Sequence, residues 1–362
     1  MTAARTGDEA AFAALVRRHR GELRVHCYRM LGSYDEAEDL TQETLLRAWK
    51  NLAGFEGRAT FRAWLYRIAT NACLDVLAGR RRRVLPDQLT PPADPAAGRP
   101  PRTDLAWLQP FPDRLSGPGS APGSGPGSGL SSGLGGGPGG GPEPVAPGRD
   151  EPEAVAVTRE TIELAFLAAI QHLPPRQRAV LILRDVLGWP ARDTAAVLDG
   201  SVASVNSALQ RARATLAEWL PRRRLDWAPA TAPTAAERAV LLRYMAAVER
   251  ADLAALAALL AEEVRTTMPP FPMWFAGRPA VLAALAAGWD PGSPAYVGRF
   301  RMVATGANRQ PAAAAYVRRP GGTAYEAFAI GVLRIENGRI AEIIAFHDPG
   351  LFAAFGLPPA YR

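Results

Sequence analysis

Between residues 60 and 76 the sequence gathers an aromatic ring, a cation and an amide at helical spacing. Trp64, Arg67 and Asn71 share one face of a helix that starts after Thr60, an N-cap residue. Apolar residues on another face predict a buried stripe: Phe61, Leu65, Ile68, Ala72 and Val76. An aromatic ring stacks on an unpaired base, and a cation and an amide hydrogen-bond to it. For Trp64 alone, a place in the core explains the residue equally well.

Residues 35–49 form a helix with an acidic stripe, which we define as Asp39, Gln42, Glu43 and Leu46. The residues that can pack inward lie on a different face: Ala37, Leu40, Thr44 and Ala48. Carboxylates beside an exposed leucine, on a basic protein, suit a protein partner better than DNA. Periodicity alone also allows a merely solvated helix face.

Residues 166–219 read as successive helices with a turn at Asp199-Gly200, which is the pattern of a helix-turn-helix. The last helix, 202–219, offers polar side chains: Ser204, Asn206, Ser207, Gln210, Arg211 and Arg213. Its apolar residues can pack inside: Val202, Val205, Leu209 and Leu216. Small polar residues before arginines suit an N-terminus near base edges and a flank on phosphates.

Other reactive residue types are sparse. His347-Asp348 could supply an acid or base, or His347 could be a satisfied histidine at a strand end. Cys27 and Cys73 lack the spacing of a zinc site, so we expect small buried core residues and no metal. The arginine cluster 80–83 could touch phosphate or complement a helix dipole.

The bulk properties indicate several domains and a polyanionic partner. A chain of 362 residues exceeds what one core organises, and its net charge is +7. No apolar run is long enough to span a bilayer, and the first residues are acidic where a signal peptide is basic. We therefore expect a cytoplasmic protein that does not act at a membrane.

The composition divides the chain. Residues 116–142 are almost wholly Gly, Pro and Ser, which predicts a flexible tether inside a Pro-rich linker, 86–154. We expect helical domains at 8–85 and 155–222, a third domain at 235–350 after a short Pro/Ala/Thr stretch, and a tail at 351–362.

The third domain begins with two helical patterns and continues as strands. The predicted strands are 264–268, 300–305, 312–318, 325–335 and 339–346, with Asn337-Gly338 as a tight hairpin turn. The fold class is thus multidomain, with two all-α domains followed by an α+β domain.

The first helical domain resembles region 2 of extracytoplasmic-function (ECF) sigma factors. The resemblance rests on Asp35-Glu-Ala-Glu-Asp-Leu-Thr-Gln-Glu-Thr44, on Phe55-Glu-Gly-Arg58 and on Trp64-Leu-Tyr-Arg-Ile-Ala-Thr-Asn71. It implies a surface that binds core RNA polymerase at the β′ clamp helices: Asp35, Glu38, Asp39, Gln42, Glu43 and Leu46. It also implies contacts to the minus-10 element: Phe55, Glu56, Gly57, Arg58, Trp64, Arg67 and Asn71.

The second helical domain resembles sigma region 4, through Leu173-Pro-Pro-Arg-Gln-Arg-Ala-Val180 and the helix-turn-helix. This implies recognition of the minus-35 element by the polar side chains of 202–219 named above, and a contact of the domain with the β flap of the polymerase. The family often has a cation where Asn206 stands, which leaves the preferred promoter sequence open.

The third domain resembles the SnoaL-like branch of the NTF2-like cone fold, notably in residues 268–278 and in His347-Asp348-Pro349. The resemblance implies a cavity, with these candidate lining residues: Met268, Trp274, Tyr296, Tyr325, Phe328 and His347. Sigma factors with such a fused domain use it in place of a separate anti-sigma factor, which implies regulation in cis, with or without a small-molecule ligand.

The leading expectation is a promoter-specificity subunit of RNA polymerase without catalysis or cofactor. Two alternatives are an enzyme of the cyclase or isomerase type fused to a DNA-binding module, and a conventional repressor or activator. The acidic stripe and residues 55–58 argue against the repressor or activator, which needs neither.

Overall fold

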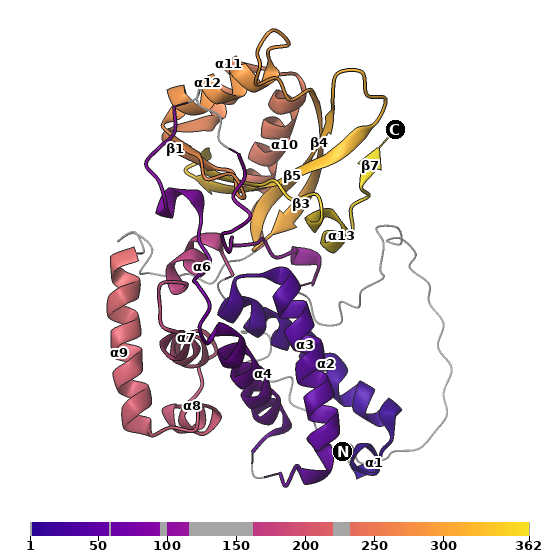
Figure 1. Ribbon diagram of the computed structural model, residues 1–362, viewed down its shortest axis with the longest axis vertical. Helices are drawn as coiled ribbons and strands as arrows, with labels where there is room; N and C mark the ends of the chain where they lie inside the picture. The colour runs from indigo at the N-terminus through magenta and orange to yellow at the C-terminus, as the bar shows by residue number, and fades with distance from the viewer. Residues whose placement is uncertain (1, 58, 95–99, 116–161, 220–231, 362) are drawn as a thin grey trace.

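The computed structural model describes residues 2–57, 59–94, 100–115, 162–219 and 232–361. In Figure 1 a helical part lies below, a C-terminal part with a sheet lies above, and an irregular segment runs between them. Two all-α units thus precede an α+β unit, which confirms the predicted fold class. The predicted tether at 116–142 lies outside the described residues.

Three long helices build the first unit after the short α1 (Thr2–Arg5): α2 (Glu9–Leu31), α3 (Tyr34–Asn51) and α4 (Phe61–Leu77). The side chains of Asp8, Ser33 and Thr60 cap the three helices by accepting backbone N–H groups. The buried face of α4 differs from the predicted stripe. Leu65 and Ala72 are buried as predicted and Tyr66 and Cys73 are buried as well, while Phe61, Ile68 and Val76 are only partly buried. The cause is that α4 packs against α8 of the second unit as well as against α2 and α3.

Residues 86–94 and 100–115, which we call the strap, join the helical part to the sheet. Val84 pairs with Trp107, Thr90 Oγ1 donates to Pro272 O over 2.9 Å, and Arg114 Nε donates to Ala354 O over 2.8 Å. The expectation of a flexible linker is therefore wrong for these residues. A Pro-rich composition lacks regular periodicity, yet its backbone and its few apolar side chains find partners on folding.

The second unit has the predicted helix-turn-helix. It contains α6 (Leu164–Ile170), α7 (Pro175–Leu181), a π-helical turn (Ile182–Val186), α8 (Ala191–Val197) and α9 (Val202–Trp219). Asp199 adopts a left-handed φ of 49° in the turn between α8 and α9.

The C-terminal unit packs helices on one sheet. It opens with α10 (Ala235–Glu249) and α11 (Leu253–Leu259). All five predicted strands are present as β1 (Leu260–Thr267), β3 (Arg299–Ala307), β4 (Gln310–Arg318), β5 (Tyr325–Glu336) and β6 (Arg339–Phe346). The sequence analysis missed α12 (Arg278–Trp289), α13 (Leu351–Ala354) and the short strands β2 (Trp274–Ala276) and β7 (Ala360–Tyr361).

The strand order is β2-β1-β6-β5-β4-β3, and β7 pairs with β5. The β5–β6 hairpin turns at Asn337 and Gly338, which both have positive φ, as the sequence predicted. Successive residues of β4 alternate between two cores: Ala313 and Ala315 pack with α10 to α12, while Ala314 and Tyr316 belong to a second core. The sheet is therefore buried on both faces.

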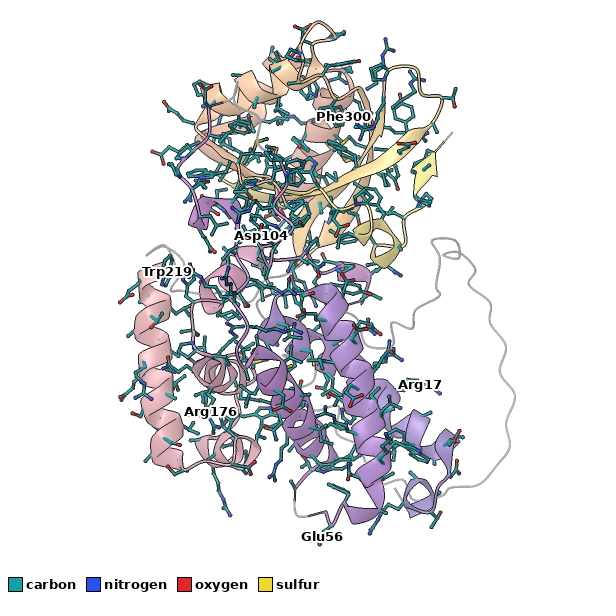
Figure 2. The ribbon with its side chains drawn as sticks, viewed as in Figure 1. Arg17, Glu56, Asp104, Arg176, Trp219 and Phe300 are labelled. Carbon is teal, nitrogen blue, oxygen red and sulfur yellow. The ribbon has the colours of Figure 1, made fainter. Side chains whose placement is uncertain are left out.

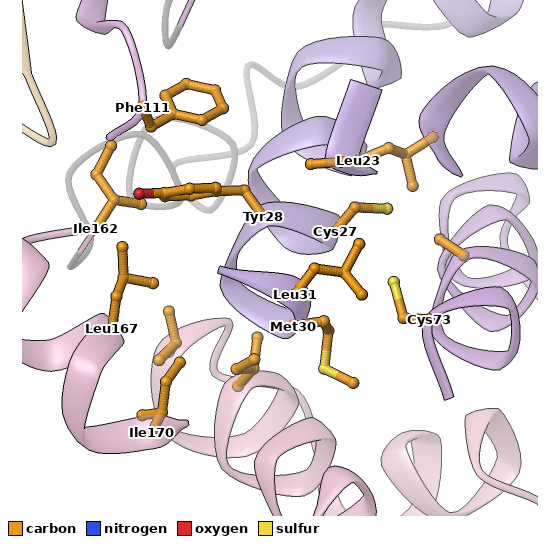
Figure 3. Packing of buried hydrophobic residues seen from close by; sticks show 14 of the residues in the cluster. Leu23, Cys27, Tyr28, Met30, Leu31, Cys73, Phe111, Ile162, Leu167 and Ile170 are labelled. Atoms are coloured by element: carbon orange, nitrogen blue, oxygen red, sulfur yellow. The ribbon is translucent and has the colours of Figure 1, made fainter. Parts of the chain in front are cut away.

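That second core is continuous with the helical part. Figure 3 shows Tyr28 of α2 next to Phe111 of the strap, with Ile162 and Leu167 of the second unit nearby. One apolar cluster thus joins α2, α4, the strap, α6 to α9 and the outer face of the sheet. Among the described residues, no helix is long and apolar enough to cross a membrane.

Candidate functional site

The acidic stripe lies on the exposed face of α3. Asp39 and Gln42 are exposed, and Leu46 keeps 55% of its surface exposed despite its apolar side chain. Glu43 forms an ion pair with Arg47 one turn further on, with 2.8 Å between its carboxylate oxygen and Arg47 Nε. Such surface pairs are weak, so Glu43 stays available to a partner. The structure therefore presents the stripe as an open surface.

Two further carboxylates of α3 are already engaged. Asp35 is exposed, but its Oδ2 accepts a hydrogen bond of 2.9 Å from Gln109 Nε2 of the strap. Glu38 pairs with Arg20 at 2.8 Å and with the buried Arg24 at 2.7 Å, both from α2. Glu38 therefore balances a buried cation inside the first unit, and it differs from the free docking residue that the sequence predicted.

An aromatic cluster connects the 55–57 loop to α4. The ring of Trp64 lies 5.0 Å from that of Phe55 and 5.7 Å from that of Phe61, between centroids. Trp64 is half-buried in this cluster, so its ring packs without being enclosed. Glu56 and Gly57 are exposed, and Figure 2 shows Glu56 at the end of the helical part that is remote from the sheet. Arg58 lies outside the described residues.

Arg67 on α4 reaches the helix-turn-helix. Its Nη2 lies 2.6 Å from Asp199 Oδ1, in the turn before α9. Asn71, one turn after Arg67 on α4, is half-buried. The candidate base-contacting residues of α4 therefore lie at the border between the two helical units.

The arginine cluster 80–83 makes contacts within the protein. Neither of the two predictions, a phosphate contact or a complement to a helix dipole, included them. Arg80 and Arg83 both pair with Glu36 of α3, at 2.7 and 2.8 Å, and Arg83 also donates to Trp107 O of the strap. Arg82 contacts His172, whose ring stacks on the exposed Trp219 at the end of α9. These arginines tie the end of α4 to α3, to the strap and to the second unit.

The last helix of the helix-turn-helix, α9, keeps four of the six candidate base-reading residues exposed, and within the described structure their side chains form no hydrogen bond or ion pair with another element: Asn206, Ser207, Gln210 and Arg211. The only hydrogen bond among these side chains in the described structure runs from Arg211 Nη1 to Ser207 Oγ, over 3.1 Å. In Figure 1 α9 lies at the outer edge of the helical part.

Three residues of α9 differ from the expectation. Ser204 serves the start of the helix, because its hydroxyl donates to Ser201 O over 2.7 Å and accepts from Ser201 N–H. Arg213 makes a two-pronged ion pair with Asp185, at 2.8 and 2.7 Å. Val202 was expected inside but is 44% exposed, since it lies in the first turn, beyond the contact with α8.

Comparisons with known proteins identify the family of the chain and its domains. Sigma-70 region 2 matches residues 15–83, sigma-70 region 4 matches residues 163–216, and the SnoaL-like domain matches residues 241–343. The ECF RNA polymerase sigma factor SigG of Mycobacterium tuberculosis is 40% identical over 355 residues, which cover 98% of this chain and 85% of that protein. The chain belongs to the ECF RNA polymerase sigma factors.

Two further relatives agree with this assignment. The ECF RNA polymerase sigma factor SigW of Bacillus subtilis is 44% identical over 81 residues, 22% of this chain and 41% of that protein. The crystal structure of the Mycobacterium tuberculosis extracytoplasmic function sigma factor SigJ covers 96% of this chain with a TM-score of 0.58 and 20% identity, and 99% of its own chain is matched. It shows that the two proteins share the fold. The protein is thus a sigma factor with a fused SnoaL-like domain.

Sequence reasoning missed Arg178, which links region 4 of this sigma factor to region 2. Its side chain is buried and bonds to oxygens at the end of α6 and at the end of α2: Ile170 O, Gln171 O, Gln171 Oε1, Leu173 O and Met30 O. Burial lowers the pKa of Arg178 to about 10, so the group stays charged at neutral pH. A cation suits the carbonyl end of α2. Nothing in the local sequence separates such an arginine from a solvated one.

The SnoaL-like domain of the sigma factor brings only some of the candidate pocket residues together. Met268 and Phe328 pack against its core, and the ring of His347 lies edge-on to Phe328, 4.8 Å between centroids. Trp274 instead donates its indole N–H to Thr90 O of the strap over 2.7 Å. Tyr325 packs against the other core, and Tyr296 lies in the loop between α12 and β3. The prediction that Tyr325 lines the cavity is therefore wrong. Trp274 bonds to the strap and Tyr296 lies in a loop, so the structure does not group them with Met268, Phe328 and His347.

His347 is the one candidate acid or base in that group. Burial lowers its pKa to about 4, so the imidazole is neutral at pH 7. Its Nε2 is buried and finds no hydrogen-bond partner among the described residues. The described residues therefore leave Nε2 without the partner that a satisfied histidine needs at this atom. The described residues contain no cluster of His, Cys, Asp and Glu able to hold a metal ion.

Proposed function

We propose that the acidic stripe on α3 is the surface that docks this sigma factor on core RNA polymerase, at a basic helical surface of the β′ subunit. The observation that carries the proposal is the exposed Leu46 beside Asp39 and Glu43. An apolar side chain costs free energy in water, so it favours a protein partner, and the carboxylates select a basic one. Asp35 extends this surface toward the start of α3, whereas Glu38 acts only indirectly through Arg20 and Arg24.

The two promoter elements have separate surfaces in the proposal. The loop at 55–57 and the exposed sides of Trp64, Arg67 and Asn71 serve the minus-10 element, where bases must leave the stack to be read. The residues Asn206, Ser207, Gln210 and Arg211 read the minus-35 element in the major groove. Arg213 joins them as a phosphate contact after it leaves Asp185. The proposal places the protein in the cytoplasm, where bacterial RNA polymerase works.

The SnoaL-like domain acts in this proposal as a regulator in cis and not as an enzyme. Its sheet shares a core with the strap and both helical regions, so any change in the domain is transmitted to the DNA-binding parts. One observation favours the alternative of a cyclase or isomerase: a neutral, unpartnered imidazole at His347 could accept a proton. Turnover of candidate ketone or epoxide substrates that disappears in His347→Gln would support that alternative.

The affinity of the full-length protein for core polymerase tests the docking surface. In Asp39→Arg/Glu43→Arg both charges of the stripe are reversed, and we expect a loss of at least about 2 kcal/mol, roughly thirtyfold. Glu262→Arg/Glu263→Arg is the matched control, because it makes the same change of net charge at two exposed residues of β1. Equal affinity of the stripe variant and the control, with both correctly folded, would rule out the assignment.

A further inference from the structure

The strap residue Gln109 uses its hydrogen-bonding groups on the corner between α2 and α3. Its backbone N–H donates to Gly32 O over 3.0 Å, and its carbonyl accepts from Tyr28 Oη over 2.7 Å. Its side-chain Oε1 accepts from Ser33 Oγ over 2.6 Å, and its Nε2 donates to Asp35 Oδ2 over 2.9 Å. Gln109 therefore holds the point where α3 begins.

The groups that Gln109 contacts fix the first turn of α3. Ser33 is the N-cap of α3, and its hydroxyl oxygen accepts from the N–H of Glu36 over 3.3 Å while it donates to Gln109. The bond from Gln109 Nε2 fixes the rotamer of Asp35, which is otherwise an exposed and freely rotating carboxylate. One strap residue thus orders both the cap of α3 and the carboxylate that starts the docking surface.

The SnoaL-like domain reaches the same corner through Asn308, in the turn between β3 and β4. Asn308 Nδ2 donates to Tyr28 Oη over 2.9 Å, the hydroxyl that donates to Gln109 O. Asn308 also pairs with Phe111, donating its N–H to Phe111 O over 2.9 Å and accepting from Phe111 N–H at Oδ1 over 2.8 Å. Figure 3 shows Tyr28 and Phe111 side by side in this region, and Asn308 is fully buried.

We propose that Gln109 is a positioning residue for the docking of core polymerase, and that Asn308 of the SnoaL-like domain holds Gln109 in place through Tyr28. Asn308, Tyr28, Gln109 and Asp35 form one continuous chain of hydrogen bonds from the C-terminal domain to the start of α3. The inference rests on the proposed docking function of α3. It assigns the SnoaL-like domain a defined role, which is to order the polymerase-binding surface.

The geometry also gives the sign of the effect. Asp35 stays exposed while it is bonded to Gln109, and Asp39, Gln42 and Leu46 are exposed in the same compact arrangement. The strap therefore braces this surface without covering it. Without these hydrogen bonds, Asp35 and the first turn of α3 must become ordered when core polymerase docks. That ordering costs free energy, so binding is weaker.

A double-mutant cycle on the full-length chain tests the pairing. Gln109→Glu keeps an oxygen for Ser33 Oγ but sets a carboxylate against Asp35, and we expect core affinity to fall about three- to tenfold. Asp35→Asn restores a donor opposite that carboxylate. In the Asp35→Asn background, the added Gln109→Glu change should therefore cost less than about twofold.

Thermal unfolding of the same variants distinguishes a loss of core affinity caused by a misplaced Asp35 from one caused by a less stable fold. Thr90→Val is the control, since the hydroxyl of Thr90 bonds the strap to Pro272 O at the end of the strap away from Gln109, and its core affinity should match wild type. An equal cost of Gln109→Glu in both Asp35 backgrounds would overturn the proposal, as would an unchanged affinity in every Gln109 variant. If Asp39→Arg/Glu43→Arg also left the affinity unchanged, the docking surface itself would be at fault.

The C-terminal end of the chain is tested with Asn308→Gly. Glycine accepts the left-handed φ of 56° at this residue, so the change removes the side chain without straining the turn. We expect core affinity to fall about threefold or more, because Tyr28 Oη loses a donor and Gln109 loses its support. Asn337→Gly, at a φ of 51° in the exposed β5–β6 hairpin, is the control for the backbone effect of an Asn-to-Gly change and should leave affinity unchanged. Equal affinities of the two glycine variants would remove Asn308 from the proposal.

Discussion

The carboxylate of Asp113 lies where the strap meets the turn between β3 and β4. It accepts a hydrogen bond of 2.7 Å from the N–H of Arg309, and burial raises its pKa to about 6 from the usual 3.8. The folded protein therefore binds this proton more tightly than the unfolded chain does. The contribution of Asp113 to stability rises as the pH falls from above 6 toward 4, and ionisation above pH 6 opposes folding.

Asp113→Asn keeps an oxygen for Arg309 N–H and removes the charge. At pH 8 we expect the variant to be more stable than wild type by about 1–3 kcal/mol, from about 1.4 kcal/mol per pKa unit. The difference should shrink as the pH falls through 6, because wild-type Asp113 then becomes neutral too. Urea unfolding between pH 5 and 8 measures this difference in the free energy of unfolding. Titration of the histidines affects both proteins equally, so it cancels in the difference. A gap that does not depend on pH would show that Asp113 does not titrate in this range.

The sequence predicted which side chains could bind a partner, but it did not predict which of them already form ion pairs or hydrogen bonds within the protein. Asp39, Gln42 and Leu46 are exposed as predicted, because helical periodicity alone places them away from the core. Glu38 and Arg213 have partners at Arg24 and Asp185, and such pairings depend on how whole helices pack. The contacts of Gln109 and Asn308 were missed for the same reason: their partners lie far away in the sequence.

At the scale of elements, the proposal assigns base readout and phosphate contact to different residues of α9. We expect Asn206→Ala to reduce discrimination between a cognate and a scrambled minus-35 duplex by about 1–3 kcal/mol, since it removes one base contact. Arg213→Ala should weaken both duplexes alike and lower the salt dependence of binding by about one ion. Fluorescence anisotropy of the polymerase-bound protein at several salt concentrations distinguishes the two. Identical effects of both variants on both duplexes would contradict the assignment of α9.

Elements whose apolar residues recur at a regular spacing were predictable from the sequence, and elements without such a spacing were not. The helices α3 and α4 of region 2, the helices of region 4 and the five long strands follow apolar periodicity, so their places were predicted within a few residues. The missed β2 and β7 are three and two residues long, too short for any periodicity to show. The strap has no long periodic pattern. Apart from the short 3-10 turns at Pro86–Gln88 and Asp113–Leu115, tertiary contacts order it.

At the scale of the whole molecule, the two surfaces that we propose to read the promoter are in contact. Arg67 pairs with Asp199, and the rings of Tyr66 on α4 and Trp189 before α8 lie 5.1 Å apart. Two promoter elements separated by two or more helical turns lie several tens of ångströms apart, at about 34 Å per turn. We therefore expect regions 2 and 4 to separate when both elements are bound.

Energy transfer between two dyes measures that separation. Asp75→Cys on α4 and Glu218→Cys on α9 supply exposed labelling sites, while the native Cys27 and Cys73 are buried. We expect efficient transfer in the free protein and a large drop when core polymerase and promoter DNA are both present. Transfer that stays the same in the promoter complex would mean that the compact arrangement persists during initiation.

The central claim is that this chain directs RNA polymerase to promoters through α3 and α9. Transcription of a library of genomic DNA fragments with core polymerase, followed by mapping of RNA 5′ ends, tests it most directly. We predict 5′ ends that depend on the protein, share one upstream pair of sequence elements, and are lost with Asp39→Arg/Glu43→Arg while Glu262→Arg/Glu263→Arg retains them. The absence of protein-dependent 5′ ends, or ends without a shared upstream pair, would contradict the account.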